Sequence, residues 1–148
     1  MIDIKSKFNI DLPYGWEDQT VYIFRGPEEG DFQHSLMLAI DRHLSHKDIS
    51  DFALEKIEPI ERSMQNCEVL KKEEITIPGG NPTFEFVYKM ILSEDYSNFM
   101  KYIFVIKDDL GFTFSAGFTK KTYKTVGAGL KDVIDAILPG TYSPEEED

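Results

Sequence analysis

Residues 83–118 constrain the fold most, because they form a run of long strands separated by short turns. Residues 83–92 and 98–107 are rich in aromatic and β-branched side chains, which favour strands. A further strand, residues 112–118, follows Asp108-Asp109-Leu110-Gly111, where we expect a hairpin in which Gly111 supplies a positive φ. Strands joined by short turns pair antiparallel, so this region predicts an antiparallel sheet.

The rest of the chain supplies further strands and two helices. Strands are expected at residues 8–12, 20–24, 35–42 and 68–77. Apolar residues at helical spacing predict a helix over residues 49–64, capped by Asp48 or Ser50 and kinked or broken at Pro59. A last helix is expected over residues 119–138. The predicted fold class is α+β, with an antiparallel β-sheet of about six to seven strands, two flanking helices and the order βββαββββα.

Length and patterning predict one domain in the cytoplasm. A chain of 148 residues, 41% of them hydrophobic, is large enough for one core. We expect residues 1–140 to form a single domain and residues 141–148 to be an acidic mobile tail. Residues 1–5 lack the apolar run of a signal peptide, and no segment approaches the ~20 apolar residues that span a bilayer. We therefore expect a cytoplasmic protein that does not insert into membranes.

The acidic charge restricts the classes of partner. A formal net charge of −11 repels phosphate backbones and anionic lipid headgroups, which argues against nucleic acid as a partner. A basic or apolar protein partner is not disfavoured. Cys67 is the single cysteine, so an internal disulfide and a zinc site of several thiolates are both excluded.

Residues with catalytic or metal-binding chemistry are few. Asp41, His43, His46 and Asp48 are suitable ligand types for zinc or nickel. Their segment joins a strand end to a helix start, however, where capping explains the aspartates and solvation explains the histidines. No serine lies in a nucleophile-elbow frame of glycines. We therefore expect no enzyme activity, no cofactor and no metal.

The predicted sheet has two unlike faces. One face is aromatic and should be buried by the helices: Phe84, Phe86, Tyr88, Met90, Tyr102, Phe104, Ile106, Phe112, Phe114 and Phe118. The other face mixes small, apolar and polar side chains: Glu85, Val87, Lys89, Ile91, Lys101, Ile103, Val105, Thr113, Ser115 and Gly117. It would be open to water or receive a partner's helix, and its apolar strip extends to Val21, Ile23, Leu36, Leu38 and Ile40. For any single member, an ordinary core residue is the simpler interpretation.

The most distinctive run is Leu12-Pro13-x-Gly15-Trp16-x-Asp18-x-Thr20-Val21, followed by Phe24. Pro13 and Gly15 predict a turn, and Trp16 is expected to fill the edge of the core. With Asp41-Arg42-His43-Leu44 at a strand end, this run resembles the DcrB-like family, which includes the Eag-type chaperones of bacterial type VI secretion effectors. The pattern of strands and helices matches that family to about Leu138.

The resemblance implies a fold shared with PsbP-like photosystem proteins and with a Ran-binding nuclear import factor. For Eag-type members it implies a cytoplasmic homodimer whose open apolar sheet surface shields transmembrane segments of a toxin before export. Combined with the mixed sheet face, it predicts a set of partner-binding residues: Val21, Ile23, Leu38, Ile40, Val87, Ile103 and Val105.

Two other functions remain open. The first is an adaptor or immunity-like protein that binds a soluble folded partner. The second is a small-molecule binder or enzyme with a pocket between helix and sheet, for which the sequence offers no paired acid and base.

Overall fold

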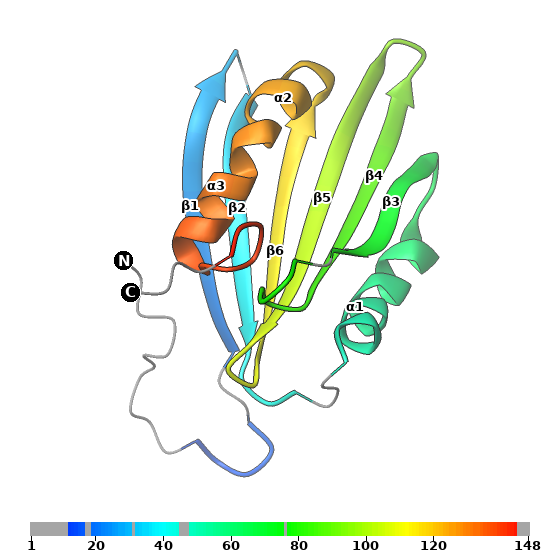
Figure 1. The fold of residues 1–148 in the computed structure, drawn as a ribbon. Coiled ribbons are helices and arrows are strands. Elements are labelled where there is room, and N and C mark those ends of the chain that lie inside the picture. The colour runs from blue at the N-terminus through cyan, green and yellow to red at the C-terminus, as the bar shows by residue number, and fades with distance from the viewer. Residues whose placement is uncertain (1–11, 17–18, 31, 45–47, 76, 145–148) are drawn as a thin grey trace.

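One six-stranded antiparallel sheet forms the centre of the molecule (Figure 1). The computed structural model describes residues 12–16, 19–30, 32–44, 48–75 and 77–144. The strand order is β1-β2-β6-β5-β4-β3, with β1 at Gln19–Glu29, β2 at Phe32–Asp41, β3 at Cys67–Ile75, β4 at Thr83–Ser93, β5 at Tyr96–Lys107 and β6 at Leu110–Thr119. The predicted α+β class and antiparallel pairing are confirmed. The strand expected at residues 8–12 lies outside the described residues, apart from Leu12, which has no regular structure.

Helices α1 (Ile49–Ser63), α2 (Lys120–Thr125) and α3 (Leu130–Ile137) complete the fold. The Asp48 carboxylate caps α1 by accepting from the Ser50 amide at 2.8 Å, as predicted. The helix continues through Pro59, so the predicted break does not occur. The single C-terminal helix predicted from the sequence is divided, because Gly127–Gly129 forms a 3₁₀ turn between α2 and α3. Glycine is a poor helix former, which explains the position of the division.

The turn between β5 and β6 differs from the predicted hairpin. Asp108 and Asp109 adopt positive φ angles of 53° and 62°, whereas Gly111 lies inside β6, so the predicted role of Gly111 is wrong. Short polar side chains tolerate this backbone region better than most residues. Gly111 instead lies against two side chains, since a Cβ there would lie 2.6 Å from Leu44 Cδ2 and 2.7 Å from Phe52 Cζ.

This turn sets the register that divides side chains between the two faces. Ile103 lies opposite Phe114, and Val105 lies opposite Phe112. Directly opposed residues of an antiparallel pair point to the same side of the sheet. The prediction that Phe112, Phe114 and Phe118 share the aromatic face of β4 is therefore wrong, because pairing across the turn places them on the other face.

Each face of the sheet has its own core. The α3-side core contains Leu36, Leu38, Ile40, Ile103, Val105, Phe112, Phe114, Ala116, Phe118, Leu130, Ile134 and Leu138. The α1-side core contains Ile49, Phe52, Ala53, Ile57, Phe84, Phe86, Tyr88 and Phe104. Figure 1 shows α2 and α3 crossing in front of the half of the sheet formed by β1, β2 and β6. The architecture is thus three layers, with the sheet between helices.

The packed domain extends beyond the predicted boundary at residue 140. Thr141 is completely buried, and the Asp135 Oδ1 atom accepts from the Thr141 and Tyr142 amides at 3.1 and 2.7 Å. The Ser143 hydroxyl contacts the other Asp135 oxygen at 3.2 Å. Thr141, Tyr142 and Ser143 therefore belong to the packed domain, because Asp135 holds them against α3; residues 145–148 of the predicted mobile tail lie outside the described part of the chain.

The turn between β3 and β4 is joined to the end of α3. The Asn81 amide donates to the Gly140 carbonyl at 2.8 Å. This approach leaves no room for a side chain at Gly80, where a Cβ would lie 2.7 Å from the Gly140 oxygen and 2.9 Å from Ile77 Cβ. Both neighbours are backbone or β-carbon atoms, which cannot rotate out of the way.

We therefore expect Gly80→Ala to lower the free energy of unfolding by roughly 1–3 kcal/mol, as overpacking does elsewhere. Urea denaturation at neutral pH measures the change. Gly129→Ala is the matched control, since no atom lies within 4 Å of a Cβ placed there. Equal losses of stability in the two variants would show that the contact with Gly140 does not restrict this turn.

Candidate functional site: an open strip of the sheet

Part of the α1 side of the sheet is not covered by α1. The register places Val21 opposite Ala39, which lies opposite Thr113. In the next row, Ile23 lies opposite Met37, which lies opposite Ser115. We call these residues the open strip: Val21, Ile23, Met37, Ala39, Thr113 and Ser115. Thr113 itself pairs with Phe104 of the α1-side core, so the open strip continues that face of the sheet beyond the helix.

The open strip exposes large apolar side chains beside small ones. Val21 is 47% exposed, Ile23 65% and Met37 45%. Ala39, Thr113 and Ser115 are partly buried. Such a surface allows the backbone of another segment to approach closely, while the larger side chains provide apolar contact area.

Strand alternation explains why the open strip is apolar. Tyr22 and Phe24 of β1 pack against the α3-side core, and Val21 and Ile23 point to the opposite face. Residues 21–24 carry apolar or aromatic side chains on both faces. Such a segment is ordinarily buried on both faces of a sheet. In β1 the described part of the chain leaves Val21 and Ile23 exposed on one of those faces.

The structure separates the seven predicted partner-binding residues into two groups. Val21 and Ile23 lie on the open strip. The other residues are completely or almost completely buried and are not accessible to a partner: Leu38, Ile40, Val87, Ile103 and Val105. The prediction of an exposed position is wrong for these residues, because the register places them on the α3 side, where helices and the Pro139–Tyr142 segment cover the sheet.

Sequence reasoning missed Met37 and Ala39. The signal for them was the alternation along β2, in which Leu36, Leu38 and Ile40 share one face. Their burial leaves Met37 and Ala39 on the other face, beside Val21 and Ile23. Pairing with β6 decides which of these two groups of β2 side chains is buried, and the pattern of β2 alone does not specify that pairing.

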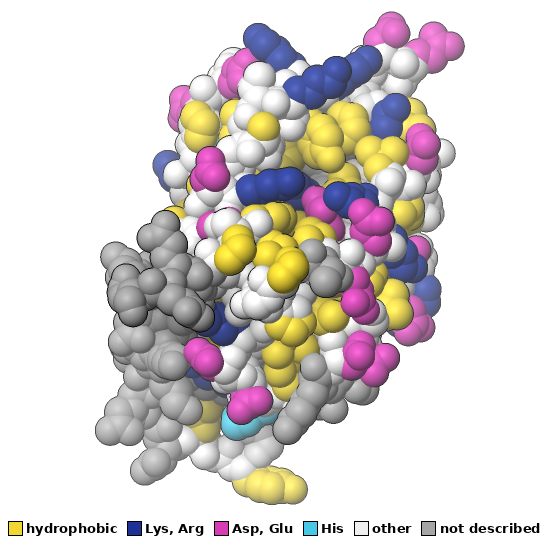
Figure 2. Space-filling view, viewed as in Figure 1, with side chains coloured by type: hydrophobic (Ala, Val, Ile, Leu, Met, Phe, Trp, Pro, Cys, Tyr) yellow, Lys and Arg dark blue, Asp and Glu magenta, His cyan; other side chains and the backbone are white. Residues whose placement is uncertain are grey.

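Two charged residues of the predicted open face are buried as ion pairs. The Glu85 carboxylate lies 3.0 Å from Lys101 Nζ and 2.8 Å from Lys71 Nζ. Burial alone raises the pKa of Glu85, but hydrogen bonds from Lys71 and Lys101 outweigh it and lower that pKa below the usual value. The hydrogen bond to Glu85 raises the pKa of Lys71. This triad joins β3, β4 and β5 on the α3 side of the sheet. Figure 2 shows Lys and Arg side chains beside Asp and Glu side chains on this side of the molecule.

The two aspartates considered as metal ligands, Asp41 and Asp48, have other roles in the structure. Asp41 forms an ion pair with Lys56 at 3.1 Å, and Asp48 caps α1. His43 is exposed, and His46 lies outside the described residues. Within the described ranges, no group of three or more His, Cys, Asp and Glu side chains is arranged to hold a metal ion.

The N-terminal turn forms, but Trp16 does not fill the core. The Trp16 amide donates to the Pro13 carbonyl at 3.1 Å, and Gly15 has a φ of 90°. The Trp16 side chain is 73% exposed, so its predicted core position is wrong.

No helix in the described residues has the length and hydrophobicity needed to cross a membrane.

Comparison with known proteins identifies the family. The model of the DcrB family matches residues 8–125, which is most of the chain. The chain belongs to the DcrB family. No curated protein matches it.

One solved structure shows the same fold at low sequence identity, and two others have lower TM-scores. PA94 from Pseudomonas aeruginosa, described as a protein of unknown function and putative regulator, has a TM-score of 0.67 and 18% identity, covering 86% of this chain and 88% of its own. Cyanobacterial PsbP from Synechocystis sp. PCC 6803 has a TM-score of 0.47 and 11% identity, covering 83% and 92%. The Ran-binding protein Mog1p of Saccharomyces cerevisiae has a TM-score of 0.42 and 12% identity, covering 83% and 75%. We rest the likeness of fold on PA94 alone.

The buried triad predicts a pH-dependent stability. Since the folded-state pKa of Glu85 is lowered, its contribution is present above the usual value of 4.5 and is lost as pH falls through the folded-state pKa. We expect Glu85→Gln to cost roughly 3 kcal/mol at neutral pH, because Lys101 is left buried without its charged partner. In urea denaturation the difference from wild type should shrink as the pH is lowered below about 4.5. Glu73→Gln, at the exposed ion pair with Lys71, should cost less than about 1 kcal/mol.

The division of the predicted residues between two faces is tested by placing the same charge on each. Ile23→Asp should lower the free energy of unfolding by less than about 1 kcal/mol, since the new carboxylate remains in water. Leu38→Asp should cost more than about 4 kcal/mol, because an unpaired carboxylate would be buried in the α3-side core. Circular dichroism during urea denaturation measures both. A severe loss of stability in Ile23→Asp would mean that the open strip is part of the core.

Proposed function

We propose that this chain is a chaperone or adaptor that binds an apolar segment of a partner protein on the open strip. The proposal rests on the joint exposure of Val21, Ile23 and Met37 on one face of the sheet. Exposed apolar side chains are common singly, but a contiguous group on a regular strand surface is typical of an interaction site.

An apolar helix fits this surface physically. Its ridges would contact Val21, Ile23 and Met37, and the small side chains of Ala39 and Ser115 would permit close approach. Each Å² of apolar surface removed from water contributes roughly 25 cal/mol before the costs of association. The strip lies on paired strands, so little conformational entropy is lost when a partner binds.

The finer proposal is an Eag-type role in type VI secretion. Membership of the DcrB family supports it, together with the position of Val21 and Ile23 on β1. We propose a cytoplasmic homodimer that shields a transmembrane segment of a toxin until export. The net charge of −11 favours this client, because transmembrane segments are commonly flanked by lysine and arginine. In this proposal the chain binds its client and catalyses no reaction.

Co-purification of the tagged chain from its native cell, followed by mass spectrometry, tests the proposal. We expect wild type to retain a protein with an apolar transmembrane segment, and Ile23→Asp to retain at least about tenfold less, because a carboxylate would be desolvated in the contact. Leu54→Asp is the matched control, since Leu54 is a similarly exposed apolar residue on α1.

The other outcomes distinguish the alternatives. A soluble folded partner that is lost with Ile23→Asp would favour the adaptor or immunity-like function. Retention of the partner by a folded Ile23→Asp variant would contradict the open strip as the binding surface. Binding of a synthetic peptide with the partner's apolar segment then shows whether that segment is sufficient.

A further inference from the structure

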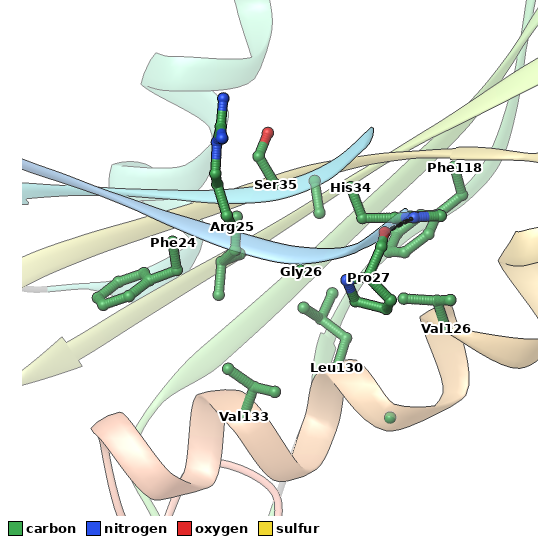
Figure 3. A pocket seen from close by; sticks show the side chains of 13 residues that line it. Phe24, Arg25, Gly26, Pro27, His34, Ser35, Phe118, Val126, Leu130 and Val133 are labelled. Atoms are coloured by element: carbon green, nitrogen blue, oxygen red, sulfur yellow. Dashed lines mark hydrogen bonds between the residues drawn. The ribbon is translucent and has the colours of Figure 1, made fainter. Parts of the chain in front are cut away.

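A second site lies on the opposite side of the sheet from the open strip. A pocket of about 290 Å³ separates α3 from the ends of β1, β2 and β6 (Figure 3). Its apolar lining consists mainly of Phe24, Leu36, Phe118, Val126, Leu130 and Val133. These side chains come from every element around the pocket, so the fold already assembles its walls.

Small residues and a backbone irregularity explain why the space is not filled. The pairing of β1 with β2 shifts between Arg25 and Glu28, where Gly26 and Pro27 interrupt the regular strand. Ala116 occupies the lining position on β6, between Phe114 and Phe118, and Gly129 contributes no side chain from the 3₁₀ turn. Larger residues at these positions would close the pocket.

Two residues of the lining, Arg25 and His34, can carry a positive charge. His34 is almost completely buried, with Nδ1 2.7 Å from the Pro27 carbonyl oxygen and its ring 5.9 Å from that of Phe118. In Figure 3 the side chains of Arg25 and Ser35 point away from the space enclosed by Leu130 and Val133. An anion would therefore lose its hydration in the pocket without gaining an ion pair with Arg25.

We propose that this pocket binds an uncharged, apolar small molecule of about the size of two fused aromatic rings. An apolar cavity of about 150 Å³ stays dry and accepts benzene, so one of about 290 Å³ has room for a bicyclic molecule. The volume is also close to the lower end of the range for small-molecule sites. An acidic ligand is disfavoured further by the net charge of −11.

A ligand reaches the pocket without unfolding the domain. Pro27, Gly129 and Val133 line it and are exposed at the surface. The open strip faces the other side of the sheet, so the pocket does not depend on the proposed function. Binding here and binding of a protein segment there are separate properties of the same strands.

A matched pair of probes tests the proposal: 2-naphthol, neutral at pH 7, and 2-naphthoate, which has the same ring system with a carboxylate. Methyl NMR follows Leu36, Leu130 and Val133 during titration of the full chain. We expect saturable shifts with 2-naphthol, and binding at least about tenfold weaker with 2-naphthoate, because its charge is not compensated in the pocket. Equal affinities, or no saturable shift with 2-naphthol, would overturn the proposal.

Two variants place the binding in this pocket. Ala116→Leu fills the interior, and Val133→Phe narrows the mouth at a half-exposed position where folding is little affected. Each folded variant should bind 2-naphthol at least about tenfold more weakly, because the ligand's volume is occupied. Leu54→Phe on α1 is the control and should bind as wild type does. Unchanged affinity in Val133→Phe, or ligand-induced shifts at Ile23 and Met37 instead, would overturn the assignment.

Discussion

Pairing across the centre of the sheet is the constraint on which the rest of the structure depends. Leu38, Phe114 and Ile103 lie opposite one another on β2, β6 and β5, and all three are completely buried. A shift of one residue in this register would turn each strand over and expose this set. The turn at Asp108 and Asp109 holds the register by pairing Lys107 with Leu110. The division of the described strand side chains between the two cores follows from it.

Unequal cover of the two faces then creates the candidate site. On one side α2, α3 and the Pro139–Tyr142 segment pack over the strands. On the other side α1 packs against β4 and β5, and its Phe52 ring meets Phe104 at a centroid distance of 6.1 Å. None of the helices in the described ranges covers β1 and β2 on this side. Their apolar side chains are exposed on strands held rigid by the α3-side core, as a preorganised binding surface requires.

The strands β1 and β2 therefore contribute to two sites at once. Phe24 and Leu36 line the pocket beneath α3, and their neighbours Ile23 and Met37 form part of the open strip. Alternation along the strand separates the two sites by the thickness of the sheet. The pocket is inferred from the shape and chemistry of this chain alone.

The amino-acid pattern by itself determined six of the seven predicted strands, a helix cap at Asp48 or Ser50 and the antiparallel class, since these depend on local periodicity, capping and short-range turns. The run over residues 12–24 indicated the family. It also placed Val21 and Ile23 on one face of β1. Only the tertiary structure decided which side chains of β2 and β6 lie on the same face of the sheet as Val21 and Ile23. Leu38 and Met37 are both apolar neighbours on β2, and the pairing of Leu38 with Phe114 buries one and exposes the other. That choice is a long-range contact between segments far apart in the chain, and no local pattern contains it.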